Sequence, residues 1–149
     1  MPELRQLKRK AAMSLEIYNT TRREIPQKKL EAIMESVIEA EGYVVGSVIA
    51  VFCGDRMIQR INREFLGHDY PTDTITFRYG SEKAIDGEFY ISLDVVGKNA
   101  RRFKTGFENE LFRVTIHAAL HLAGYDNKHA GTKTAMREKE DYHLSQLSF

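Results

Sequence analysis

Four segments of the chain have the pattern of β-strands. Residues 14–19 (S-L-E-I-Y-N) and 74–79 (T-I-T-F-R-Y) alternate apolar and polar positions, which is typical of a strand with one buried face. Residues 44–52 are rich in valine and isoleucine and predict a strand that is buried on both faces. After a turn over 81–87, residues 88–96 predict the last strand.

Helical spacing predicts two helices among these strands. Between Pro26, tolerated at the start of a helix, and Gly42, a common stop signal, apolar residues recur at the i, i+3, i+4, i+7, i+8 spacing of one buried face. They are Leu30, Ile33, Met34, Val37 and Ile38. A second helix is expected after the turn at 54–55. Its apolar side holds Ile58, Ile61 and Phe65.

From Gly97 onward the pattern is helical. Thr105 and Glu108 have the spacing of a capping box, and residues 108–122 are apolar almost all round, which predicts a core helix. Residues 132–147 predict a final, charged helix. The order of elements predicts an α+β fold, a single layered domain in which helices pack a mixed four-stranded sheet and the core helix lies near the C-terminus.

Length and composition fit one globular domain. The chain has 149 residues, 22 Lys+Arg against 21 Asp+Glu, and a 42% hydrophobic share, so it can build a core without disulfides. We interpret residues 1–13 as a basic tail, with Met13 as an alternative start, and residues 14–149 as the single domain. The net charge of +1 neither predicts nor excludes a nucleic-acid partner, so any such surface has to be local.

The sequence also bears on location. Cys53 is the only cysteine, which excludes an internal disulfide and fits a reducing cytoplasm. No run approaches the ~20 apolar residues that cross a bilayer, and the basic N-terminus has no apolar core behind it. We therefore expect a cytoplasmic protein with no membrane partner.

His117 and His121 are the strongest candidates for chemistry. They are four residues apart in the predicted core helix, so both project from one face and can share a metal ion. Their neighbours are apolar, and two unpaired imidazoles would be costly there. Gly124 then allows a sharp reversal that would bring a third ligand back towards the pair. The candidates for that ligand are Asp126, Asn127 and His129.

The residue after the first histidine argues against a metallopeptidase. The H-E-x-x-H pattern places a general-base glutamate there, and this chain has Ala118. A metal ion can still polarise a phosphoryl oxygen, so phosphodiester hydrolysis is better supported than peptide hydrolysis. The pattern names no general base.

Three motifs resemble one known family. The stretch H-A-A-L-H-L-A-G-Y-D-N-K, from His117, resembles the signature H-G-x-L-H-L-x-G-Y-D-H of the YbeY-type rRNA-maturation endoribonucleases. The stretch I-N-R-E-F-L-G-H-D-Y-P-T-D-T-I-T-F, from Ile61, and G-E-F-Y-I-S, from Gly87, are similar to two further motifs of that family. The resemblance covers most of the chain from about residue 14 onward.

This resemblance implies a metal-dependent hydrolase that cleaves single-stranded RNA with one Zn²⁺ ion held by three ligands. It implies a role in maturation of the 16S rRNA 3′ end and in ribosome quality control. Ribosomal RNA and the small ribosomal subunit would be the partners. It says nothing of the oligomeric state.

The chain departs from the family pattern at three positions. Asn127 stands where the family has its third ligand histidine, and an amide oxygen is a poor zinc ligand. On ligand strength we rank His129 first, then Asp126, then Asn127. Leu66 replaces an arginine thought important for RNA cleavage and cannot clamp a phosphate. Ala118 replaces a glycine, which adds one methyl group.

Basic residues ahead of the core helix are candidates for contact with RNA. Lys98, Arg101 and Arg102, followed by Lys104, have no acidic residue among them. An alternative to the enzyme is a non-catalytic ribosome-assembly factor with a structural or degenerate metal site, which Leu66 and Asn127 favour.

Overall fold

The computed structural model describes residues 14–68, 73–80, 82–126 and 129–149. The predicted basic tail at 1–13 lies outside the described residues. The elements, in chain order, are β1 (Ser14–Asn19), α2 (Gln27–Ala40), β2 (Val44–Cys53), α3 (Asp55–Leu66), β3 (Thr74–Tyr79), β4 (Ala84–Ser92), α4 (Leu93–Arg102), α5 (Phe107–Leu122) and α6 (Ala130–Ser145).

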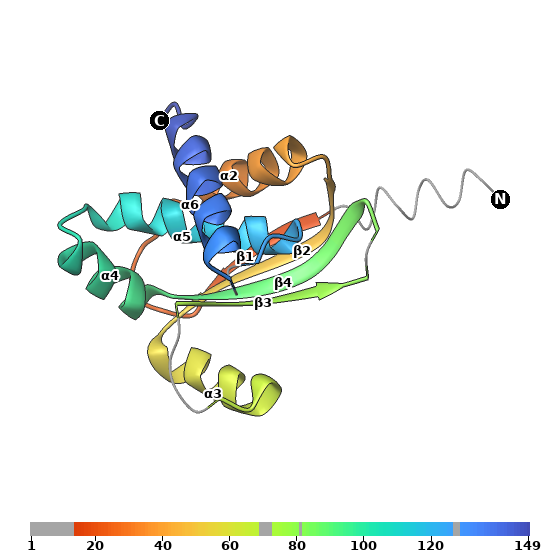
Figure 1. The fold of residues 1–149 in the computed structure, drawn as a ribbon. Coiled ribbons are helices and arrows are strands. Elements are labelled where there is room, and N and C mark those ends of the chain that lie inside the picture. Colours follow the sequence, from red (N-terminus) through yellow and green to blue (C-terminus); the bar gives the residue numbers. More distant parts are fainter. Residues whose placement is uncertain (1–13, 69–72, 81, 127–128) are drawn as a thin grey trace.

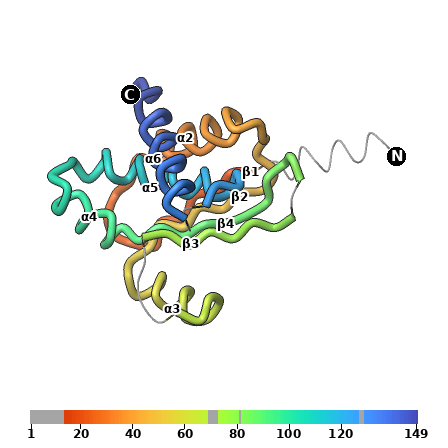
Figure 2. The backbone as a smooth tube through the Cα atoms, viewed as in Figure 1, coloured from red at the N-terminus to blue at the C-terminus, as the bar shows by residue number. Residues whose placement is uncertain are grey.

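The strands form one mixed sheet in the order β1-β2-β4-β3. The pairs β1–β2 and β2–β4 are parallel, and β3 runs antiparallel to β4. Helices α2, α5 and α6 lie on one side of the sheet, and α3 lies on the other (Figures 1 and 2). The predicted α+β class with a mixed four-stranded sheet is therefore confirmed.

The main core lies between the sheet and the helices of the larger layer. The buried face of α2 consists of the five residues predicted for it, from Leu30 to Ile38. Helix α5 is buried on nearly all sides, as its sequence predicted, because it packs against α2, α4, α6 and the strands. A smaller cluster beneath α3 includes Val51, Cys53 and Ile58. The site described below is thus carried by the most tightly enclosed helix.

Two strand predictions are corrected by the structure. Strand β2 is buried on both faces only over residues 50–53, since α3 covers just this end of its second face. Strand β4 starts at Ala84 rather than 88 and ends at Ser92 rather than 96. Leu93 instead begins α4, because the Ser92 hydroxyl caps that helix by accepting the Val95 N–H at 3.2 Å.

Two helix predictions are also corrected. The capping box at Thr105 is absent, because α5 starts one residue later, with Gly106 as its N-cap, and Glu108 pairs with Lys29 at 3.2 Å. Phe65 was assigned to the buried side of α3 but is 68% exposed. Among the aromatic side chains of the described residues, Phe65 contacts only Phe77, in an edge-to-face pair with ring centroids 5.9 Å apart.

Candidate metal centre and its cleft

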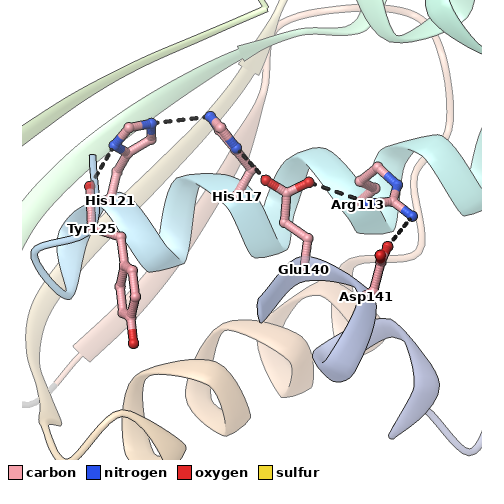
Figure 3. Close-up of polar contacts among 6 residues, drawn as sticks. All are labelled: Arg113, His117, His121, Tyr125, Glu140 and Asp141. Carbon is pink, nitrogen blue, oxygen red and sulfur yellow. Dashed lines mark hydrogen bonds and ion pairs between the residues drawn. The ribbon is translucent and has the colours of Figure 1, made fainter. Parts of the chain in front are cut away.

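His117 and His121 project from the same face of α5, one turn apart, as their spacing predicted. Their rings stand almost perpendicular, with centroids 4.5 Å apart. The two Nε2 atoms face each other at 3.0 Å (Figure 3). In a tetrahedral zinc site with Zn–N bonds of ~2.0–2.1 Å, two nitrogen ligands lie about 3.3 Å apart. The pair is therefore within a few tenths of an ångström of a zinc-binding geometry.

The far sides of both rings are held by oxygen acceptors. His117 Nδ1 lies 2.7 Å from Glu140 Oε2, and His121 Nδ1 lies 2.9 Å from the backbone oxygen of Tyr125. A carbonyl or a carboxylate can only accept, so each Nδ1 carries the hydrogen and donates it. In neutral rings each Nε2 atom then carries an unprotonated lone pair, and the two lone pairs point at one another.

Two converging lone pairs repel unless a cation lies between them. A proton is disfavoured on His121, because burial and the neighbouring His117 lower its pKa. A metal ion satisfies both nitrogens without charging either ring. The acceptors behind the rings are the kind of partner that orients metal-binding histidines. The donor set therefore fits a divalent ion that accepts imidazole ligands.

The turn after α5 supplies the Tyr125 carbonyl. Gly124 adopts a φ of +100°, its N–H donates to His121 O at 3.0 Å, and the Tyr125 N–H donates to Leu120 O at 3.0 Å. This is a Schellman ending, in which glycine takes the left-handed position. The sharp reversal expected at Gly124 is confirmed. It brings a backbone oxygen of Tyr125 to the outer side of His121.

The side chain of Tyr125 points away from the histidines and anchors the turn (Figure 3). Its hydroxyl donates to Glu41 Oε1 at 2.6 Å, at the end of α2. Lys139 Nζ and His143 Nε2, both on α6, lie 3.3 Å from the other Glu41 oxygen. Burial raises the pKa of Glu41, but these hydrogen bonds and the charge of Lys139 outweigh it and lower the pKa overall. Glu41 is therefore held as a carboxylate.

Helix α6 therefore supports both imidazoles. Glu140 reaches His117 directly, and its other oxygen accepts from Arg113 at 3.3 Å. Arg113 also donates to Asp141 at 2.9 Å (Figure 3). The role of Glu140 was not predicted. A signal for it exists, because Met136, Glu140 and His143 fall at i, i+4 and i+7 and form the buried face of a helix that is otherwise charged.

The described residues place no third ligand beside the two histidines. Within the described ranges, no group of three or more His, Cys, Asp or Glu side chains is placed to hold a metal ion. His129 stands at the start of α6, and its backbone N–H donates to Thr132 Oγ1 at 3.0 Å. Asp126 is described, and Asn127 lies outside the described residues. All three assignments stay predictions.

A cleft of about 510 Å³ opens beside His117 between α4, α5 and α6. Lys133 and Arg137 of α6 and Arg113 of α5 line it, together with Phe103 at the end of α4. Glu110, also in the lining, is only 6% exposed, and burial is the main cause that raises its pKa. This buried acid was missed by the sequence analysis, because the spacing of Glu110 within an apolar helix does not reveal a cleft.

The basic residues predicted on α4 do not themselves line this cleft. Lys98 pairs with Asp55 at 3.5 Å, and the guanidinium of Arg102 lies 5.4 Å from the centre of the Phe103 ring. Lys98, Arg101 and Arg102 are not among the described residues that line the cleft, so their contact with RNA stays a prediction. Leu66, the replacement for the family arginine, is the last residue of α3 and is 47% exposed.

No helix in the part of the chain that the structure describes is long and apolar enough to cross a membrane.

Several known proteins are similar to this chain over most of its length. The chain is 68% identical over 135 residues to a protein of Chlorobium phaeobacteroides strain BS1 named Endoribonuclease YbeY, covering 91% of this chain and 98% of that one. A Chlorobaculum tepidum protein of the same name is 56% identical, again over 91% and 98% of the two chains. A solution structure from Thermotoga maritima matches with a TM-score of 0.64 at 32% identity, covering 89% of this chain and 87% of the other.

A model of the family described as Endoribonuclease YbeY matches residues 16–148, and this range contains both histidines and the helix that supports them. The expected resemblance is confirmed. The chain belongs to the Endoribonuclease YbeY family of RNA-cleaving hydrolases.

Proposed function

We propose that this chain is a zinc-dependent endoribonuclease that matures the 3′ end of 16S rRNA and acts in ribosome quality control, with the small ribosomal subunit as its partner and the cytoplasm as its location. Family membership supports RNA cleavage. The observation that carries the metal is the convergence of the two Nε2 atoms of His117 and His121 at 3.0 Å, with both Nδ1 atoms held by oxygen acceptors.

Different residues of the chain would bind the metal ion, orient its ligands and bind the substrate. His117 and His121 would hold the ion, and Glu140 and the Tyr125 carbonyl keep both rings in the tautomer that binds it. A divalent ion bound there supplies Lewis acidity towards a phosphodiester. The side chains of Lys133 and Arg137, which line the same cleft, would hold the phosphates of the substrate.

Zinc is the proposed ion because imidazole nitrogens suit it and the two Nε2 atoms, 3.0 Å apart, are close to the separation of two nitrogen ligands in a tetrahedral site. The third ligand is proposed from the turn after Gly124, with His129 ahead of Asp126 and Asn127 because imidazole binds zinc more strongly than an amide oxygen does. Individual substitution of these three residues, followed by measurement of bound zinc, would identify it.

The proposal is tested with the double variant His117→Ala/His121→Ala. Purified without a polyhistidine tag, it should lose both bound zinc, measured by elemental analysis, and cleavage of single-stranded RNA. Asn109→Ala, at the exposed start of α5, serves as the control and should retain both. If the double variant folds and still cleaves RNA with unchanged metal content, the proposal is wrong. The non-catalytic assembly factor, by contrast, requires a wild type that binds ribosomes without cleaving RNA.

A further inference from the structure

The cleft beside His117 continues past Arg113. A second hollow of about 350 Å³ adjoins it. Both hollows are lined by Phe103, Glu110, Arg113, Arg137 and Glu140. They are therefore one groove. It runs from His117 and Lys133 at one end to Thr105 and Asp141 at the other, with α5 as its floor and α4 and α6 at its sides.

The unpaired charges that this groove presents to solvent are positive. Two of its acids, Glu110 and Glu140, are only 6% and 8% exposed, and Asp141 accepts from Arg113 at 2.9 Å. The fourth acid in the lining, Asp73, is half-buried at the His117 end. Lys133 and Arg137 are exposed. Neither makes a side-chain hydrogen bond or ion pair with the described residues.

Lys133 and Arg137 are one helical turn apart on α6, so their charges repel on the same face. Four residues of helix rise about 6 Å, which is comparable to the step between neighbouring phosphates of a single strand. A chain of phosphates laid along α6 would meet both cations and relieve their repulsion.

Phe103 gives the groove an aromatic rim. Its side chain is 58% exposed, although it is large and apolar. The backbone beneath it is fixed by a Schellman ending of α4, in which the Thr105 N–H donates to Ala100 O at 2.9 Å. This ending places Lys104 at a φ of +56°, in the left-handed region that few side chains adopt. The ring is thus an exposed apolar surface on a rigid turn, with the Arg102 cation near its face.

We infer that this groove is the path of single-stranded RNA, with an unpaired base stacked on Phe103 and successive phosphates held by Arg137 and Lys133. The inference rests on the proposed function and extends it to the path of the strand and the side chain on which a base stacks. A base can stack on a side chain only when it is free of its own neighbours, so a duplex would not use this rim. Preference for single strands is then a property of the end of α4, separate from the histidine pair.

Binding is measured by fluorescence anisotropy with a labelled, non-cleavable 2′-O-methyl oligoribonucleotide and the zinc-loaded protein. Phe103→Ala should weaken binding about tenfold or more, because stacking on an aromatic side chain supplies much of the affinity per base. Phe103→Trp should restore it. Tyr18→Ala, an aromatic residue that is 51% exposed on β1, is the matched control and should bind as the wild type does.

The phosphate contacts have their own measurement. Lys133→Ala and Arg137→Ala should each reduce the slope of log K against log salt by about 0.7, the value for one phosphate contact on a single strand. Arg56→Ala and Arg60→Ala have the same i, i+4 spacing on α3, across the sheet, and should leave the slope unchanged.

The inference is overturned if Phe103→Ala binds the single strand as tightly as the wild type, or if the α3 pair changes the slope as much as the α6 pair. Either result leaves metal-dependent RNA cleavage at the histidine pair standing, provided that the wild type cleaves RNA. If the wild type cleaves no single-stranded RNA, the proposed function fails, while binding that depends on Phe103 still supports the groove.

Discussion

Replacement of Glu140 by alanine tests whether the histidine pair is a metal site held in place by α6. The change removes the acceptor that lies 2.7 Å from His117 Nδ1 and leaves His121 and its Tyr125 partner untouched. It also breaks the ion pair with Arg113 at 3.3 Å. Asp141→Ala is the matched control, because Asp141 is the neighbouring carboxylate on α6 and pairs with the same arginine without touching either histidine.

Glu140→Ala should lower zinc affinity and stability much more than Asp141→Ala does. Glu140 is 8% exposed, and a buried hydrogen bond to a charged group contributes about 1.5–3 kcal/mol. Loss of such an outer partner of a metal-binding histidine lowers metal affinity by roughly 10- to 100-fold. The Asp141 side chain is 59% exposed, and an exposed pair contributes about 0–1 kcal/mol to stability. Asp141→Ala should therefore leave metal affinity almost unchanged.

The measurement is zinc affinity by competition with a chromophoric chelator, with thermal unfolding of the metal-free protein recorded in parallel. Glu140→Gln keeps an oxygen acceptor for Nδ1 and should fall between alanine and the wild type. If Glu140→Ala binds zinc as tightly as the wild type, or if Asp141→Ala weakens zinc binding equally, then Glu140 does not orient a metal ligand and the reasoning about the site fails.

Three further substitutions test the surroundings of the site. Gly87→Ala should lower the free energy of unfolding by about 1–3 kcal/mol or more in urea titration, because the new Cβ would lie 2.6 Å from the backbone oxygen of Phe77, which cannot easily move. Gly124→Ala should lower the free energy of unfolding by about 1–2 kcal/mol, because the φ of Gly124 is +100°, although the new Cβ would have no atom within 4 Å. The same change should weaken zinc binding by displacing the Tyr125 carbonyl. Its control, Gly131→Ala in the first turn of α6, should not lower the free energy of unfolding. Glu110→Gln should stabilise the protein at pH 7, since burial raises the pKa of Glu110 and the fold disfavours its charge. That gain should vanish as the pH falls below about 4.5, where the carboxyl is neutral in both states, and a gain that persists there would contradict the assignment.

Local periodicity was reliable where a segment is long and its pattern is unambiguous. The buried face of α2 and the near-complete burial of α5 were both predicted, because 3.6 residues per turn decides which side chains share a face. The boundary between β4 and α4 was misplaced because residues 88–96 are mostly apolar and too short for periodicity alone to divide between strand and helix. The Ser92 cap divides it.

The sequence alone also did not predict which basic residues lie beside the site. The sequence pointed to the basic cluster at Lys98, Arg101 and Arg102, since clustering along the chain is all that a sequence displays. The cations that line the cleft beside His117 are instead Arg113 of α5 and Lys133 and Arg137, which come from a helix that follows the histidines. Which basic residues surround a site depends on which helices pack together, and neither cluster carries that information by itself.

The sequence by itself determined that His117 and His121 share one face of a core helix, and that glycine follows them, because helix geometry and the left-handed preference of glycine act within a few residues. Only the tertiary structure decided that Glu140, 23 residues after His117, reaches that histidine, and that Glu41 at the end of α2 anchors the Tyr125 turn. The physical reason is that such meetings arise from the packing of α2 and α6 against α5, which sums many weak apolar contacts along the whole chain.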